Sequence, residues 1–162
     1  MKLKITTDYA IRLLLCLSAA PGKLTAEELS EKTAIPKPTV IKVMGRLKTR
    51  NWVSAREGVR GGYTLVAPLE EIALMDVFSA MSETITINRC HAEACIPGYA
   101  PDNCPVRNTY DVIQSIVEGM FRSTTLAMML RGDLGSLESV RDAAIGASHC
   151  AQPRLNAAGE SA

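Results

Sequence analysis

The chain has 162 residues, of which 47% are hydrophobic and 22% charged, so it has enough apolar side chains for a core and is not a disordered protein. Its longest apolar run, residues 11–17, is far shorter than the ~20 residues that span a bilayer, and no secretory signal opens the chain, so we expect a cytoplasmic protein without membrane segments. The net charge of +1 hides an asymmetry between two parts of the chain. Residues 1–63 carry 12 Lys and Arg against 5 Asp and Glu, whereas the remaining residues carry 6 Lys and Arg against 12 Asp and Glu. The basic part suits a polyanionic partner such as DNA.

The N-terminal region predicts an amphipathic helix. Apolar side chains recur over residues 8–19 on one broad face. Thr7 or Asp8 is placed to cap the start of this helix, and Pro21 and Gly22 end it. The helix therefore presents one apolar face to a core.

Two further helices are predicted close together. Thr25 and Glu28 form a capping box that opens a short acidic helix over residues 26–33. A third helix is expected over residues 37–48, with apolar residues on one face and cations on the other. Two short helices joined by a turn match the helix-turn-helix arrangement, in which the second helix enters the major groove of DNA. The candidate DNA contacts of this helix are Lys37, Thr39, Lys42 and Arg46.

Residues 52–66 predict a β-hairpin directly after the basic helix. Two runs that favour strands flank a glycine-rich turn over residues 57–62, where positive φ angles and close approach to a partner are possible. Arg56 and Arg60 supply positive charge at the tip, as phosphate or minor-groove contacts. With a further helix over residues 69–82, the first domain is predicted to be a winged helix-turn-helix spanning residues 1–82.

Three cysteines are clustered in a loop predicted over residues 83–105. Cys90, Cys95 and Cys104 place three soft ligands in one segment, and both iron–sulfur clusters and zinc require thiolates. Zinc is the weaker interpretation, because no second closely spaced pair of ligands follows Cys104. His91 is adjacent to Cys90 and is a candidate for supporting the site rather than ligating. The remaining cysteines, Cys16 in the first helix and Cys150 near the C-terminus, are expected to be a core residue and an incidental one.

The C-terminal half predicts one long helix. Apolar positions continue at helical spacing over residues 106–131, and a domain this small cannot cover so long a face. We therefore expect this helix to pair with its copy in a homodimer, followed by a flexible tail over residues 132–162. The predicted fold is mainly α, with a small β-hairpin wing, a winged helix-turn-helix and a long dimerisation helix.

Three features together resemble the Rrf2 family of bacterial transcriptional regulators, which includes the iron–sulfur regulator IscR and the nitric-oxide-sensing repressor NsrR. They are the opening Met1-Lys2-Leu3 with Thr7-Asp8-Tyr9-Ala10-Ile11-Arg12, the Gly61-Gly62-Tyr63 wing, and the three-cysteine loop. The resemblance covers residues 1–131 and implies a winged-helix domain, a long dimerisation helix and a cluster between them.

The resemblance also implies a ligand set. Cys90, Cys95 and Cys104 match the three cluster cysteines of the family, and Asp8 matches the fourth ligand that the partner subunit supplies in some NsrR-type members. Arg107 stands where an IscR-like protein carries a histidine ligand, which favours Asp8 and an NsrR-like site. Three thiolates and one carboxylate give one ligand per iron of a 4Fe–4S cluster, so that cluster is preferred, and a 2Fe–2S centre stays open. Two features depart from the family pattern. The gap between Cys95 and Cys104 is eight residues long, and the wing carries Glu57.

These observations predict an iron–sulfur transcriptional regulator, expected to be a repressor, that senses nitric oxide, redox state or iron. It would bind a near-palindromic operator in double-stranded DNA, with two recognition helices in major grooves roughly 34 Å apart. A cluster-free thiol–disulfide switch is one alternative, and a small iron–sulfur electron-transfer or carrier protein is another. An enzyme is not expected, because no nucleophile–base pair or phosphate-cradling loop is recognisable.

Overall fold

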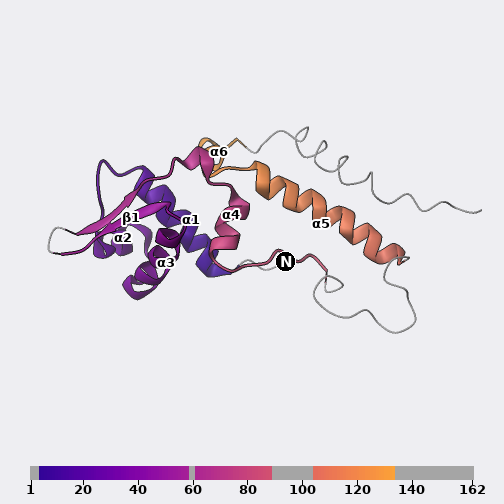
Figure 1. Ribbon diagram of the computed structural model, residues 1–162, viewed down its shortest axis with the longest axis horizontal. Helices are drawn as coiled ribbons and strands as arrows, with labels where there is room; N and C mark the ends of the chain where they lie inside the picture. Colours follow the sequence, from indigo (N-terminus) through magenta and orange to yellow (C-terminus); the bar gives the residue numbers. More distant parts are fainter. Residues whose placement is uncertain (1–3, 59–60, 89–103, 134–162) are drawn as a thin grey trace, which may run out of the picture.

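The computed structural model describes residues 4–58, 61–88 and 104–133 and confirms a mainly helical fold with one two-stranded antiparallel hairpin. The first helices and the hairpin form a head, from which the long helix α5 projects (Figure 1). The elements follow the chain in the order α1 (Ile5–Ser18), α2 (Ala26–Thr33), α3 (Lys37–Thr49), β1 (Val53–Arg56), β2 (Gly62–Leu65), the 3-10 helix η1 (Leu69–Glu71), α4 (Leu74–Ala80), α5 (Pro105–Ser123) and α6 (Leu126–Arg131).

Helix α1 begins earlier than predicted, and its cap comes from elsewhere in the chain. The N-cap residue is Lys4, so neither Thr7 nor Asp8 caps the helix, and that expectation was wrong. The backbone N–H of Lys4 donates to the Glu83 carboxylate at 2.6 Å, and the Thr7 hydroxyl donates to the same carboxylate. A carboxylate at a helix N-terminus satisfies unpaired N–H groups and is stabilised by the helix dipole. A remote residue thus replaces the local cap.

The capping box of α2 is confirmed. The N–H of Glu28 donates to the Thr25 hydroxyl at 3.2 Å, and the N–H of Thr25 donates to the Glu28 carboxylate at 2.7 Å. The bonds that the N–H and the hydroxyl of Thr25 donate to this carboxylate lower the pKa of Glu28 below its ordinary value of 4.5. Ala34 then adopts a left-handed conformation with φ 55°, which turns the chain into α3. The predicted helix-turn-helix is therefore present, with Pro38 in the first turn of α3.

The hairpin is present in the predicted position. Val53 pairs with Leu65 and Arg56 with Gly62. Leu24, between α1 and α2, exchanges two backbone hydrogen bonds with Tyr63, of 3.0 and 2.7 Å, which fix the hairpin to the head. Gly62 has φ 149°, and a Cβ there would lie 2.9 Å from the carbonyl oxygen of Leu24, so glycine is needed for this close approach.

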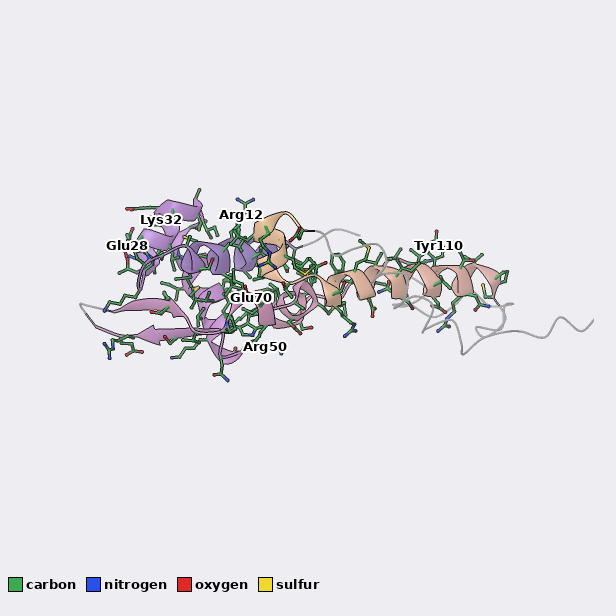
Figure 2. The ribbon with its side chains drawn as sticks, turned by 90° about the horizontal axis from the view of Figure 1, so that it is seen from above. Arg12, Glu28, Lys32, Arg50, Glu70 and Tyr110 are labelled. Atoms are coloured by element: carbon green, nitrogen blue, oxygen red, sulfur yellow. The ribbon has the colours of Figure 1, made fainter. Side chains whose placement is uncertain are left out.

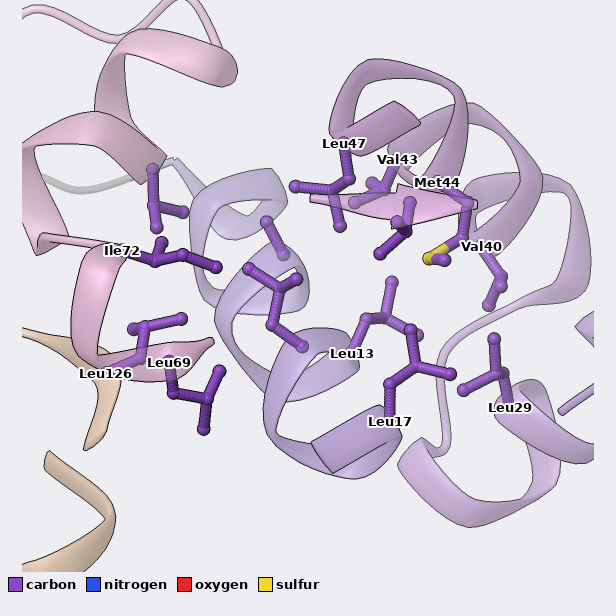
Figure 3. Close-up of a cluster of buried hydrophobic side chains, with 14 of the residues drawn as sticks. Leu13, Leu17, Leu29, Val40, Val43, Met44, Leu47, Leu69, Ile72 and Leu126 are labelled. Carbon is purple, nitrogen blue, oxygen red and sulfur yellow. The ribbon is translucent and has the colours of Figure 1, made fainter. Parts of the chain in front are cut away.

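The core of the head surrounds α1 (Figure 3). Leu13 and Leu14 are fully buried, with side chains from α2, α3 and β1 on one side and from η1, α4 and α6 on the other. The apolar face predicted for α3 is confirmed, and its buried residues are Val40, Val43, Met44 and Leu47. The recognition helix is therefore packed directly on the central helix.

Two predicted helices are each divided, and one feature explains both breaks. Ile72 and Thr124 lie in extended segments that pair with each other, through hydrogen bonds of 2.9 Å from Leu126 N–H to the Ile72 carbonyl and from Leu74 N–H to the Thr124 carbonyl. The helix expected over 69–82 therefore becomes η1 and α4, and the helix expected over 106–131 becomes α5 and α6. Local periodicity predicted the helices but could not show this contact between distant segments.

Helix α5 projects from the head (Figures 1 and 2), and several of its apolar side chains are exposed. Its one buried residue is Gln114. At its C-terminal end Phe121 packs edge-on against Phe78 of α4, with ring centroids 5.0 Å apart. Among the described helices, none is long and apolar enough to cross a membrane. The exposed large apolar side chains of α5 are Val106, Val112, Ile113 and Met120.

Candidate nucleic-acid interface and cysteine site

The outer face of α3 combines positive charge with one apolar side chain. Lys42 is exposed, as a DNA contact requires, whereas Thr39 is half-buried and its N–H bonds to the Pro36 carbonyl at 2.8 Å. Ile41 is 50% exposed beside Lys42, and Gly45 has open space where a side chain would lie. Sequence reasoning missed Ile41, although it falls outside the spacing of the buried positions. An exposed methyl group on a recognition helix can contact the methyl group of thymine.

Lys37 joins the two helices of the helix-turn-helix. Its ammonium group forms an ion pair with Glu27 in the first turn of α2, and both side chains are about half exposed. Exposed pairs of this kind contribute little stability. Lys37 therefore remains at the surface, in reach of a DNA phosphate.

Arg46 differs from the other predicted DNA contacts. It is half-buried, and its Nη1 donates to the backbone carbonyl of Met81 at 3.0 Å. Met81 is the C-cap residue of α4, where the partial negative charge of a helix C-terminus favours a cation. The guanidinium group thus faces α4 in this structure.

A hollow of about 410 Å³ separates α3 from the wing. Ile41, Gly45 and Lys48 line it from α3, and Arg56 and Glu57 line it from the hairpin. Arg56 is exposed at the end of β1, while Arg60 lies outside the described residues. With Lys48 on one side and Arg56 on the other, this hollow suits the sugar–phosphate backbone between a major and a minor groove.

Of the three clustered cysteines, the structure describes Cys104. It is the N-cap residue of α5 and only 9% exposed. Cys90, Cys95, His91 and also Cys150 lie outside the described residues. Within residues 4–58, 61–88 and 104–133, no group of three or more His, Cys, Asp or Glu side chains is placed to hold a metal ion. Cys16 is half-buried against the core, as predicted.

Gln114 fixes the segment that leads into the cysteine loop. Its side-chain carbonyl accepts from Ile87 N–H at 3.0 Å, and its amide donates to the Ile85 carbonyl at 2.5 Å and to Glu118 at 2.8 Å. The carboxamide therefore pairs with residues 85–87 much as a neighbouring strand would. Since Cys104 begins the same helix, both ends of the cysteine-containing segment are attached to α5. Sequence reasoning missed Gln114, because a single glutamine in a helix carries no local signal.

Asp8 lies on the exposed side of α1. Its carboxylate pairs with the guanidinium of Arg12 one turn later, at 2.8 Å, and their side chains are 49% and 58% exposed. Figure 2 shows Arg12 at the outer surface of this helix. Asp8 is therefore accessible to a second subunit.

The winged helix with a basic recognition helix defines a DNA-binding protein. The comparisons with known proteins place it further: residues 3–132 match the Rrf2 family, described as iron-dependent transcriptional regulators, and the chain belongs to this family. It is a DNA-binding transcriptional regulator and not an enzyme.

Relatives and solved structures agree with this assignment. A putative HTH-type regulator of Aquifex aeolicus is 27% identical over 75% of this chain and 85% of that protein. IscR of Klebsiella pneumoniae is 25% identical over 97% of this chain and 93% of that protein. Among structures, the global cysteine regulator CymR of B. subtilis has a TM-score of 0.66 at 16% identity, covering 82% of this chain and 98% of that one. T. potens IscR has a TM-score of 0.62 at 17% identity, covering 82% and 88%. These structures show the shared fold.

Proposed function

We propose that the chain is a homodimeric, cytoplasmic transcriptional repressor whose affinity for DNA depends on an iron–sulfur cluster held by Cys90, Cys95 and Cys104. Asp8 of the partner subunit is the proposed fourth ligand, as in NsrR-type members of the family, and a 4Fe–4S cluster is preferred. The observation that carries the proposal is the place of Cys104, buried at the start of α5 in a segment whose other end is also fixed to that helix.

The residues present fit such a centre. The thiolate of Cys104 would lie at the N-terminal end of a 19-residue helix, where negative charge is stabilised. Ile87 is bonded to Gln114, ten residues along α5 from Cys104, which corresponds to roughly 15 Å along the helix axis. Cys90 follows Ile87 by three residues, a length of chain that spans at most roughly 11 Å. The chain therefore has ample length to bring its cysteines together.

Asp8 would connect the proposed ligand set to the DNA-binding head. It belongs to α1, the helix on which α3 packs, and it is exposed. When Asp8 does not bind the partner's site, Arg12 neutralises it, as observed. Binding to the partner and pairing with Arg12 are alternatives for one carboxylate, so a change at the cysteine site alters the charge and position of groups on α1.

The chemistry of the site would be that of the bound cluster, which nitric oxide, oxidants or iron shortage can remove. Thiolate and carboxylate ligands would then be released, and residues 85–87 would stay attached to α5 through Gln114. The chain's own part is to hold the ligands at the N-terminal end of α5, the end that lies away from its own head (Figure 1).

DNA recognition is proposed to use both heads of the dimer. Two copies of α3 would enter successive major grooves of a near-palindromic operator, roughly 34 Å apart. Lys37, Thr39 and Lys42 are the proposed base and phosphate contacts of α3. Arg56 and Arg60 are the proposed contacts of the wing with the minor groove or phosphates. The uncovered apolar face of α5 supports the dimer, because a face of this kind is usually buried against a copy.

The test is to measure iron, sulfide and zinc in protein purified without oxygen, together with its absorption spectrum. The Cys104→Ser variant removes the described thiol, and Cys150→Ser is the matched control, since it removes a thiol outside the cluster. We expect brown wild-type and Cys150→Ser protein with nearly equal iron and sulfide, and a colourless Cys104→Ser variant. Wild-type protein that stays free of iron after reconstitution would contradict the proposal. One zinc ion per chain in place of iron would show that the cysteines form a zinc site instead.

A thiol–disulfide switch is the second candidate. It is favoured by the likeness to S. aureus CymR, one structure of which is described as an oxidised form, with a TM-score of 0.57 at 21% identity over 78% of this chain and 93% of that one. In that case, Cys104 would pair with Cys90 or Cys95. Mass spectrometry after oxidation without iron would then find a disulfide, and DNA affinity would respond to thiol reductants.

A further inference from the structure

Arg46 differs from the exposed lysines of α3, because it is half-buried and bonded to a backbone carbonyl. Its Nη1 donates to the Met81 carbonyl at 3.0 Å, whereas Lys42 on the same helix is exposed. The Met81 carbonyl belongs to the C-cap of α4, where carbonyl groups lack partners within the helix. A charge-assisted hydrogen bond to such a group is stronger than one between neutral groups. The hydrogen bond joins the recognition helix to the end of α4.

The two residues that follow Met81 bind the start of α1. Ser82 adopts a left-handed conformation with φ 53°, and its carbonyl accepts from the Lys4 ammonium group at 2.9 Å. The Glu83 carboxylate is 9% exposed and accepts from the Lys4 N–H and the Thr7 hydroxyl. Three consecutive residues therefore hold two helices of the head. We call residues 81–83 the anchor corner.

The anchor corner also continues toward α5. Glu83 N–H donates to the Phe78 carbonyl at 2.9 Å, which fixes the corner to α4, and residues 85–87 are then held by Gln114. The same stretch of backbone thus carries hydrogen bonds to α3, α1, α4 and α5. A change in its position would move the recognition helix relative to the long helix.

We infer that Arg46 is a positioning residue for DNA recognition: it sets the placement of α3 through the anchor corner and does not neutralise a phosphate. The guanidinium group is held by a backbone carbonyl, so reaching a DNA phosphate would require this hydrogen bond to break. The orientation of two recognition helices decides which operator spacing fits them. Removal of this hydrogen bond therefore affects discrimination between DNA sequences, with little effect on the electrostatic attraction that every sequence shares. The inference rests on DNA binding by the head and not on the cysteine site.

The experiment compares the full-length Arg46→Met variant with Lys42→Met, which removes an exposed cation from the same helix. Two probes are used, a duplex selected by the wild-type chain from a random library and a duplex of random sequence. Affinity is measured over a series of salt concentrations. Removing one cation that neutralises a DNA phosphate lowers the magnitude of the slope of log affinity against log salt concentration by about 0.9.

We expect Arg46→Met to keep the wild-type salt slope on random DNA. Its preference for the selected duplex, measured as the ratio of the two affinities, should fall about tenfold, which corresponds to the loss of one charge-assisted hydrogen bond. Lys42→Met should lower the salt slope. Equal decreases in affinity for both duplexes with a lower slope for Arg46→Met would show that Arg46 binds a phosphate and overturn the inference. Unchanged affinity for both duplexes would overturn it too. Wild-type protein that binds neither probe would instead contradict DNA binding itself.

Glu83→Gln keeps the test decisive if Arg46→Met fails to fold. This change weakens the anchor corner from its α1 side and removes no cation from the DNA face. It should lower the preference for the selected duplex while leaving the salt slope unchanged. Where Arg46→Met does fold, the two decreases in preference should be less than additive in the double variant, because both act through one corner. Full additivity, or an unchanged preference in Glu83→Gln, would exclude the anchor corner as the shared support.

Discussion

The head and helix α5 bury their apolar residues to very different extents. In the head, side chains of α1, α2, α3 and β1 are fully or almost fully buried around Leu13 and Leu14. In α5 the one buried residue is a glutamine, and Ile113 and Val112 are 39% and 53% exposed. The head is therefore stabilised by contacts within its own chain, whereas α5 exposes apolar side chains that the proposed partner copy would cover. In the proposed dimer, DNA binding and assembly thus belong to separate parts of the molecule.

The largest expected effect is on the core of the head. Leu47 of α3 is fully buried, so Leu47→Ala should destabilise the fold by about 2–5 kcal/mol, through reduced burial and the cavity left behind. Ile41→Ala, on the exposed face of the same helix, is the control and should change stability by less than about 0.5 kcal/mol. Urea unfolding followed by circular dichroism measures both. Similar destabilisation of the two variants would contradict the burial of this face.

Assembly should fail when charge is placed on the apolar face of α5. Ile113→Glu would bury an unpaired carboxylate in the proposed dimer interface, so the dissociation constant should rise at least about hundredfold. The matched change Asn108→Glu is made at an exposed position about 140° around the helix from Ile113 and should leave the dimer intact. Sedimentation equilibrium at several concentrations distinguishes the two. If Ile113→Glu remains dimeric, a different surface forms the dimer.

The contact between α5 and residues 85–87 is expected to have an intermediate effect. Gln114→Leu keeps a similar volume but leaves the Ile85 carbonyl and the Ile87 N–H without partners, at a cost of about 1–3 kcal/mol. Hydrogen exchange at the Ile87 amide should accelerate in this variant, and the iron content should fall if the cysteines are held as proposed. Glu118→Gln retains an acceptor for the Gln114 amide and is the control. Slow exchange at Ile87 in Gln114→Leu would show that another contact holds the segment.

The smallest effect concerns the capping box of α2 and depends on pH. The hydrogen bonds from Thr25 lower the pKa of Glu28 below 4.5, so its stabilising contribution is present above about pH 4.5 and is lost as the pH falls through the lowered pKa. Glu28→Gln should therefore have a thermal midpoint that depends less on pH below 4.5 than that of the wild type. Thermal unfolding between pH 7 and pH 3 measures it. Parallel curves for the two proteins would contradict the role of the box.

Features set by neighbouring residues could be predicted from the sequence, and those set by distant residues could not. The Thr25–Glu28 box and the hairpin follow from short patterns and were confirmed. The cap of α1 is Glu83, which lies 79 residues from Lys4, and no local pattern reveals such a partner. The same limit explains the division of the long helix, since Thr125 pairs with Ala73 across the fold.

The candidate site follows the same rule. The exposure of Lys42 and Arg56 agrees with simple amphipathic spacing. Arg46 is half-buried because its guanidinium group bonds to the Met81 carbonyl at the end of α4. The spacing of residues within α3 contains no information about this distant partner. Gln114 was missed for a related reason, because its hydrogen-bond partners are backbone groups 27 and 29 residues away.

Control of the head by the cysteine site is tested most directly by one binding measurement. The affinity for the selected duplex is measured for protein purified without oxygen, for the same protein after iron has been removed with a chelator, and for Cys104→Ser. We predict at least a tenfold difference between the first two, within the usual range of about 5- to 150-fold for coupled sites, with Cys104→Ser matching the iron-free protein. Equal affinities for all three proteins would contradict any control of DNA binding by this site.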